Sequence, residues 1–119
     1  MTAEEALRAL GDAWERRDPD AVAQLFAPDG RYEDPLFQSV PVGPEQIRAA
    51  CAEAIDELAE VSVPLRVVAT TGDLVLAEGE FRSRIAAGGR LDFPLAMVLE
   101  VRDGLVVRFA EYFDTAPLR

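Results

Sequence analysis

Hydrophobic positions in the first half of the chain recur with the spacing of helices. Leu7, Leu10 and Trp14 fall on one face of a segment that follows a Thr-x-x-Glu capping box, which predicts a first helix. A second, short helix is predicted after Asp18, because the next residue is a proline. A third helix is expected over roughly 45–60, with an acidic face turned to solvent.

The second half of the chain has the pattern of strands. A Pro-Asp-Gly turn first introduces a short strand over 31–34, ahead of the third helix. From residue 61 onward the hydrophobic period changes from about 3.6 to about 2. Four further strands are predicted, at roughly 62–71, 74–86, 90–102 and 105–114. This order indicates one α+β domain over residues 1–119, with a curved antiparallel sheet wrapped over three N-terminal helices.

Alternation along the last predicted strand places one charge in an apolar row. Leu105, Val107, Phe109 and Phe113 share a face with Glu111, which is the only carboxylate in that row. An unpaired charge in an apolar cavity costs on the order of several kcal/mol, and such a group commonly transfers protons or binds a ligand. Two structural explanations remain open: Glu111 reaches water at the sheet edge, or it pairs with an arginine.

A second acidic motif lies on the short strand over 31–34. Alternation places Tyr32 and Asp34 on the same face of that strand, just before Pro35. With Glu111 they are the candidate catalytic residues. If Asp34 and Glu111 project into one apolar cavity, desolvation and mutual repulsion should raise at least one pKa, and one proton can be shared between them.

The composition removes several kinds of catalytic site. The chain contains no His, no Lys and no Asn, and its single cysteine is Cys51. A His-dependent nucleophile, a lysine Schiff base and an ordinary zinc site are therefore excluded. No loop has the ligand spacing of a magnesium or calcium site. We expect neither a metal nor a cofactor, and proton chemistry would rely on Asp, Glu, Tyr and bound water.

The net charge and the hydropathy of the chain limit the kinds of partner that it is expected to bind. A net charge of -10 argues against nucleic acid and against anionic membrane surfaces. No apolar run approaches the length of a membrane span, and the acidic N-terminus is unlike a signal peptide. A lone cysteine, expected to be a buried hydrophobic residue, suits a reducing cytoplasm. Arginine used without lysine hints at a GC-rich bacterial genome.

From end to end, the chain resembles the nuclear transport factor 2-like superfamily, which includes ketosteroid isomerases, SnoaL-like polyketide cyclases and limonene epoxide hydrolases. The carrying segments are Arg-Asp-Pro-Asp-Ala-Val (17–22), Leu-Phe-Ala-Pro-Asp-Gly (25–30), Tyr-Glu-Asp-Pro (32–35), Gly-Pro-Glu-Gln-Ile-Arg (43–48) and Glu-Tyr-Phe-Asp (111–114). The resemblance implies a cone-shaped, cystatin-like α+β roll. The superfamily includes enzymes, binding modules and dimerisation modules, so the resemblance alone implies no single activity.

The resemblance extends to single residues only in part. Ketosteroid isomerases use the Asp of a Glu-Asp-Pro motif as general base, which implies this role for Asp34. Their two oxyanion donors would fall on Leu10 and at or beside Met97, so both donors are missing. Limonene epoxide hydrolases imply a water-activating role for Glu111, although the rest of their polar set has no counterpart. The His of SnoaL-like cyclases is absent.

Together, alternation and resemblance predict a cone that binds a small, flat hydrophobic ligand. Its expected ligand-binding residues are Trp14, Phe37, Phe81, Phe93, Leu95, Met97, Phe109 and Phe113. The alternative is that these side chains pack on one another as core.

For function we expect a cofactor-free proton-transfer enzyme of isomerase or cyclase type. It would act on a small hydrophobic carbonyl compound, with Asp34 as general base and Glu111 or Tyr32 as its partner. Two alternatives stay open: a non-catalytic ligand-binding or dimerisation module of the same fold, and an epoxide hydrolase-like activity that uses Glu111.

A homodimer is also expected, through the outer face of the sheet. The predicted outward positions carry much apolar surface for a monomer. They include Pro94, Ala96, Val98, Val106, Ala110 and Tyr112.

Overall fold

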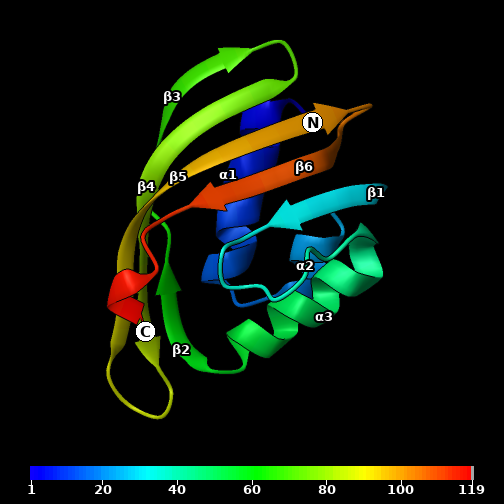
Figure 1. Ribbon diagram of the computed structural model, residues 1–119. Coiled ribbons are helices and arrows are strands. Elements are labelled where there is room, and N and C mark those ends of the chain that lie inside the picture. Colours follow the sequence, from blue (N-terminus) through cyan, green and yellow to red (C-terminus); the bar gives the residue numbers. More distant parts are fainter. Residues whose placement is uncertain (119) are drawn as a thin grey trace.

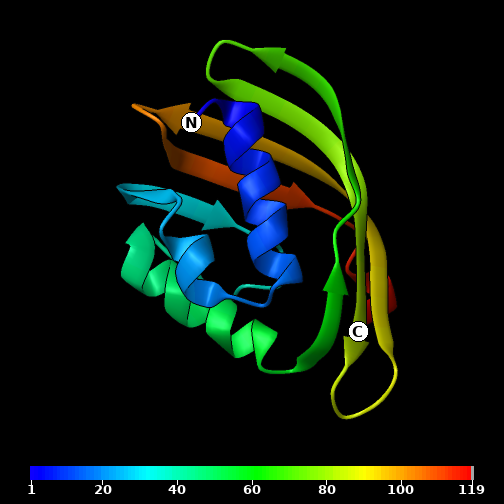
Figure 2. The same cartoon turned by 180° about the vertical axis from the view of Figure 1, so that it is seen from behind.

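The structure, a computed structural model, describes residues 1–118 and places three helices on the concave side of one strongly curled sheet (Figures 1 and 2). The helices are α1 (Ala3–Glu15), α2 (Pro19–Ala23) and α3 (Gly43–Ile55). The strands are β1 (Phe26–Glu33), β2 (Leu58–Ser62), β3 (Leu65–Thr71), β4 (Leu74–Ile85), β5 (Arg90–Arg102) and β6 (Leu105–Tyr112). A 3-10 turn, Ala116–Leu118, follows. The predicted α+β class and the curled sheet over three helices are confirmed.

The starts of the first two helices follow the predicted capping. Thr2 and Glu5 form a complete capping box at α1, in which the Thr2 side chain accepts from the Glu5 N–H and the Glu5 carboxylate accepts from the Thr2 N–H. Asp18 accepts from the Ala21 N–H at α2. None of the helices in the described chain is long and apolar enough to cross a membrane.

The sheet is mixed rather than wholly antiparallel. Its strand order is β1-β6-β5-β4-β2, and β3 pairs with the other part of β4. The pairs β2–β4, β3–β4, β4–β5 and β5–β6 are antiparallel, as the predicted hairpins require, whereas β1 pairs with β6 in parallel. The parallel pair joins the two ends of the chain, and no local turn signal could reveal it.

Three predicted boundaries were wrong. The short strand expected over 31–34 runs from Phe26 to Glu33, so the Pro-Asp-Gly segment lies within β1, where the register with β6 shifts, and forms no turn before it. The third helix ends at Ile55 instead of near residue 60, and the segment expected as one strand over 62–71 divides into β2 and β3. Pro64 lies between the two strands, at the place where they move from one part of β4 to the other. Proline interrupts a ladder because it lacks an N–H to donate.

A β-bulge in β6 overturns the predicted facing of its first residues. Glu100 pairs with Arg108 but Val101 pairs with Val106, so Val107 is an extra residue on the β6 side. The bulge changes the alternation: Val106 is 0% exposed, whereas Leu105, predicted to face inward, is 39% exposed. Beyond the bulge the prediction holds, and Phe109 lies in the core.

The close approach of β3 to β4 depends on Gly79. A Cβ atom added there would lie 2.3 Å from the Pro64 carbonyl oxygen and 3.0 Å from the Leu65 Cα. Both are backbone atoms, so neither can move without shifting β3. A glycine at this position therefore permits the strand crossing.

We expect Gly79→Ala to lower the free energy of unfolding by about 1–3 kcal/mol, because the methyl group forces the backbone apart. Gly11→Ala is the matched control: its Cβ would meet only the Leu65 Cδ2 at 3.5 Å, an ordinary contact. Gly11 lies inside α1, where alanine should stabilise by up to about 1 kcal/mol. Urea denaturation of both variants measures this, and equal effects of the two substitutions would contradict the role assigned to Gly79.

Candidate active site

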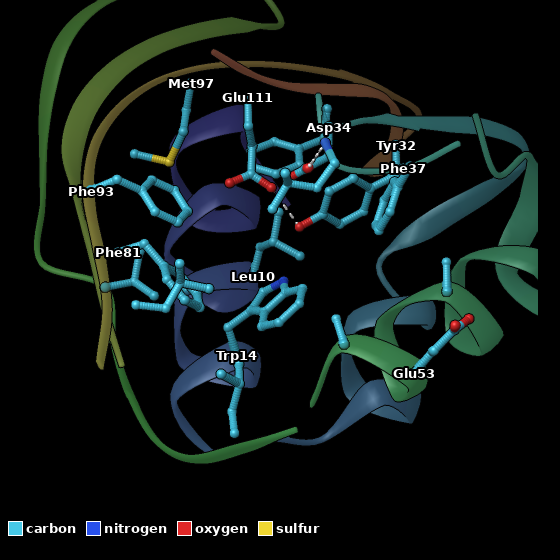
Figure 3. A pocket seen from close by; sticks show the side chains of 18 of the residues that line it. Leu10, Trp14, Tyr32, Asp34, Phe37, Glu53, Phe81, Phe93, Met97 and Glu111 are labelled. Carbon is cyan, nitrogen blue, oxygen red and sulfur yellow. Dashed lines mark hydrogen bonds between the residues drawn. The ribbon is translucent and has the colours of Figure 1, made fainter. Parts of the chain in front are cut away.

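A cavity of about 570 Å³ opens between the concave face of the sheet and helices α1 and α3 (Figure 3). Helix α1 contributes one wall, and β4, β5 and β6 contribute the opposite one. Most of the lining is apolar, and two carboxyl groups and a phenol lie together at one side. Such a volume is within the usual range for small-molecule sites.

The parallel pairing of β1 with β6 brings the three candidate catalytic residues together. Tyr32 is opposite Phe109 in this ladder, and the next pair is Glu33 with Ala110. Asp34 follows directly after β1, and Glu111 continues β6. Asp34, Tyr32 and Glu111 all line the cavity, so the two predicted acidic motifs share one site.

Hydrogen bonds connect the three side chains. The Tyr32 hydroxyl donates to Glu111 Oε1 at 2.7 Å, and the Glu111 and Asp34 carboxyl groups lie close enough to each other to share a proton. The Leu36 N–H donates to Asp34 Oδ1 at 2.8 Å. Two carboxyl groups can be hydrogen-bonded only if a proton lies between them. We call Tyr32, Asp34 and Glu111 the acid cluster.

Burial decides which carboxyl group holds the proton. It raises the pKa of Glu111 well above its usual range, and the Asp34 charge raises it further, while the Tyr32 hydroxyl only partly opposes this. Burial also raises the pKa of Asp34, but the Leu36 N–H and the Glu111 hydrogen bond work against that rise. Glu111 is therefore the protonated partner and Asp34 the carboxylate.

Tyr32 remains a neutral phenol, and its hydroxyl donates to Glu111 Oε1. It is 1% exposed, and burial, followed by the Glu111 carboxyl, raises its pKa well above 10.0. Its ring is stacked on Phe26 and makes edge contacts with Phe37 and Phe109, which fix its hydroxyl toward Glu111.

An aromatic row borders the cavity from the sheet side. Trp14 meets Phe81 edge to face with ring centroids 6.0 Å apart, and Phe81 is stacked on Phe93 at 5.2 Å. Phe93 is stacked in turn on Phe113 at 4.0 Å. Figure 3 shows Phe81, Phe93 and Met97 along the curved strands and Trp14 reaching in from α1.

The structure places six of the eight predicted ligand-binding residues in the lining: Trp14, Phe37, Phe81, Phe93, Met97 and Phe109. Leu95 and Phe113 lie outside the lining. Leu95 belongs to the buried core, and Phe113 covers the Phe93 ring. Alternation gives the inward face of a strand, but it cannot separate core contact from cavity contact.

The indole nitrogen of Trp14 has no hydrogen-bond partner among the described residues, although it is buried. In Figure 3 it lies on the ring edge that faces the acid cluster. An unpaired buried donor costs about 1–3 kcal/mol.

Sequence reasoning missed the residues that close the mouth of the cavity. Leu36, Gln38 and Ser39 come from the loop before α3, and Glu53 and Glu57 come from the end of α3 and the turn after it. The helical pattern places both glutamates on the solvated helix face; they are exposed but also border the opening. The only sequence signal for Glu53 and Glu57 was their spacing of four residues, which places both on the same side of the predicted helix.

The positions where ketosteroid isomerases would carry oxyanion donors also face the cavity. Leu10 and Met97 both line it, but neither can donate a hydrogen bond. Cys51 is buried, and burial raises the pKa of its thiol to about 12. Within residues 1–118, no three or more acidic, cysteine or histidine side chains are grouped so as to hold a metal ion.

Glu111→Gln should change the dependence of stability on pH. A carboxyl group whose pKa is raised by folding stabilises below its unfolded pKa, and this contribution is lost as pH rises through the folded pKa. Glutamine cannot ionise, so the variant should gain stability relative to wild type progressively as the pH rises above about 4, the unfolded pKa of a glutamate.

Urea denaturation across this range measures the difference in free energy of unfolding. Glu53→Gln is the control, because it removes a carboxylate from the exposed rim of the same cavity. If the Glu111→Gln difference is the same at every pH, or follows that of the control, Glu111 does not hold the proton.

Comparison with known proteins agrees with this architecture. The model of the SnoaL-like domain family matches residues 7–109. No curated protein sequence matches the chain.

Solved structures share the fold over nearly the whole chain. A protein with a ketosteroid isomerase-like fold from Catenulispora acidiphila, in complex with trimethylamine, has 27% identity and a TM-score of 0.84 over 95% of this chain and 88% of its own. A protein from Jannaschia sp. that is designated a SnoaL-like polyketide cyclase has 19% identity and a TM-score of 0.81, over 98% and 88%.

A cystatin-fold protein from Novosphingobium aromaticivorans has 18% identity and a TM-score of 0.80, over 94% of this chain and 98% of its own. The similarity to the Jannaschia and Novosphingobium proteins, at 19% and 18% identity, shows only that the fold is shared. With the family model matched over most of its length, the chain belongs to the SnoaL-like domain family of the nuclear transport factor 2-like superfamily.

Proposed function

We propose that the protein is a cofactor-free proton-transfer enzyme of isomerase or cyclase type that acts on a small hydrophobic carbonyl compound. The observation that carries the proposal is the acid cluster, in which two half-buried carboxyl groups and a phenol meet at the wall of an apolar cavity, where burial raises the pKa of Glu111 far above its usual range. Paired groups with different protonation are the usual basis for acid–base catalysis.

Asp34 is the general base in this proposal. It removes a proton from the carbon next to the substrate carbonyl, and an enolate forms. Before the reaction, the Leu36 N–H and Glu111 hold the carboxylate in place. When a substrate oxygen takes over the Glu111 hydrogen bond, Asp34 loses one stabilising partner and becomes more basic. Return of the proton to another carbon completes an isomerisation; attack of the enolate carbon on a second carbonyl completes a cyclisation.

Glu111 is the donor to the substrate oxygen. Its proton would move from the Asp34 hydrogen bond to the developing oxyanion, while Tyr32 continues to donate to Glu111 Oε1. A neutral carboxylic acid can serve as an oxyanion donor in an apolar site. The Trp14 N–H is a second candidate donor, because it is buried, unpaired among the described residues and turned toward the same part of the cavity.

The comparisons support a cavity that takes small molecules. One relative with 27% identity was crystallised with trimethylamine, and another of the same fold is designated a polyketide cyclase. The main alternative is a binding module without turnover. Leu10 and Met97 favour it, because apolar side chains stand where isomerases would have donors.

Asp34→Asn separates these two functions. The test is exchange of α-protons for deuterium in D₂O, followed by NMR, with 1-tetralone and related hydrophobic ketones as probes. Wild type should accelerate exchange, and Asp34→Asn should lower the rate about 100-fold or more, because the amide cannot accept the proton. Glu111→Gln should be milder, within about tenfold, because the amide still donates.

Two further variants complete the assay. Trp14→Phe keeps an aromatic ring and removes the N–H, so a severalfold loss of rate would identify it as a donor. Glu33→Gln is the matched control for Asp34→Asn: it changes the neighbouring residue, whose carboxylate pairs with Arg108, by the same charge. Exchange that is equally fast in Asp34→Asn and wild type would rule out Asp34 as the base.

A homodimer through the convex face of the sheet is a second proposal. Exposed apolar side chains interrupt the charged residues on β3, β4 and β6: Val68, Leu76 and Tyr112. Two residues that alternation assigns to this face are buried instead. The bulge turns Val106 into the core, and Ala110 is 1% exposed, between β1 and β5.

Light scattering at micromolar concentration should give about 26 kDa, twice the 13.0 kDa of one chain. Tyr112→Asp should shift the mass toward one chain, because it places a charge in the apolar patch and Tyr112 is 54% exposed. A mass of 13.0 kDa for the wild type would rule out the dimer.

A further inference from the structure

The described side chains that line the cavity include several carboxyl groups and no basic group. Four carboxyl groups line it: Asp34 and Glu111 at its wall, and Glu53 and Glu57 at its mouth. No arginine is among its lining residues, although residues 1–118 contain eleven. None of the ion pairs in this part of the chain includes any of the four.

Ten of the eleven arginines in residues 1–118 form ion pairs with carboxylates that do not line the cavity, and Arg17 donates to the Leu58 carbonyl oxygen at 3.3 Å. Arg108, next to the acid cluster in sequence, pairs with Glu33 at 3.0 Å and bonds the Tyr112 hydroxyl on the outer face. Arg66 and Arg82 pair with Glu78 and Glu80 on the outward row of β4. The negative charge on the half-buried pair Asp34 and Glu111 therefore has no ion-pair partner within residues 1–118.

The rest of the lining suits a cation with an apolar body. Trp14, Phe81 and Phe93 border the cavity, and Figure 3 shows them across the cavity from Asp34 and Tyr32. Aromatic rings attract alkylammonium groups through their negative faces, most strongly where water is excluded. The cavity thus combines a buried anion with aromatic walls, and its opening bears two further carboxylates.

We propose that this cavity selects hydrophobic ligands that carry a positively charged amine, and that the substrate of the proposed reaction is an amino ketone in its ammonium form. The inference rests on the proposed function and adds the charge of its substrate. When Asp34 takes the α-proton, the carbon–hydrogen electron pair becomes the enolate and the ammonium group stays intact. The intermediate is then a zwitterion with no net charge.

This substrate class suits a site that lacks the usual oxyanion donors. In a neutral ketone, deprotonation moves the negative charge from Asp34 to the enolate oxygen, and no arginine of residues 1–118 lines the cavity to stabilise it there. An ammonium group in the same molecule supplies the opposite charge close to the enolate oxygen. Anionic ligands would be repelled by both the wall and the mouth.

Binding of three probes of nearly equal shape tests the inference by isothermal titration calorimetry. The probes are (3-hydroxyphenyl)trimethylammonium, its neutral isostere 3-tert-butylphenol, and 3-hydroxybenzenesulfonate. We expect the cation to bind wild type at least about tenfold more tightly than the neutral isostere, and the anion to bind most weakly. Equal or tighter binding of 3-tert-butylphenol would overturn the inference.

Variants assign the preference to the acid cluster. The double variant Asp34→Asn/Glu111→Gln should lose most of the preference for the cation while it still binds 3-tert-butylphenol, which also shows that the cavity is intact. Glu111→Gln alone should keep the preference, because Asp34 stays charged. Glu33→Gln removes a carboxylate from the outer face and should also keep it. An unchanged preference in the double variant would contradict the assignment.

The deuterium-exchange assay keeps the two proposals separate. If a neutral ketone exchanges in an Asp34-dependent way but the cation has no binding advantage, the charge preference is wrong and the proton-transfer function stands. If the cation binds preferentially but no ketone or amino ketone exchanges, the cavity is a binding site for amines and the enzymatic proposal fails.

Discussion

The parallel pairing of β1 with β6 is the constraint on which the site depends. Every other strand pair in the described sheet is antiparallel and joins segments that are closer in sequence, whereas this pair joins residues about 80 positions apart. It places the end of β1 beside the end of β6, and so brings Tyr32 and Asp34 to Glu111. If the same strands were paired one residue out of register, the inward and outward side chains would exchange and the acid cluster would not form.

Packing and hydrogen bonds around the acid cluster offset the free-energy cost of placing its polar groups in the core. Tyr32 is packed among Phe26, Phe37 and Phe109, so its hydroxyl is rigidly aimed at Glu111. A fully charged pair of carboxylates in this environment would be strongly destabilising. A shared proton removes half of that charge, and the phenol and the Leu36 N–H donate to the carboxyl oxygens. The site is thus a small polar network inside an otherwise apolar cone.

Much of this arrangement could be predicted from local sequence pattern. Alternation identifies Glu111 as an inward carboxylate, and the same rule places Tyr32 and Asp34 together on one face of their strand. Both predictions agree with the lining of the cavity. They succeed because burial along a strand depends on a period of two residues, which the sequence displays directly.

The rest of the fold and the site depends on interactions between distant segments, which no local sequence pattern indicates. The parallel strand pair is set by packing between distant segments. The bulge at Val107 reverses which faces of the sheet Leu105 and Val106 occupy, and no glycine or other turn residue in the sequence indicates a bulge there. The loop that supplies Leu36 to the cavity has no period at all. The division between core and lining, which places Leu95 in the core, depends on packing between helices and sheet, which alternation does not show.

The shared proton also affects how the cavity responds to its surroundings. Since Glu111 resists ionisation more strongly than Asp34, the two groups together behave as a single monovalent anion in the interval between the pH at which Asp34 ionises and the higher pH at which Glu111 does. A change in the acidity of the medium within that interval would leave the electrostatic potential inside the cone nearly constant. The protein thereby isolates its interior from ambient pH without using a histidine.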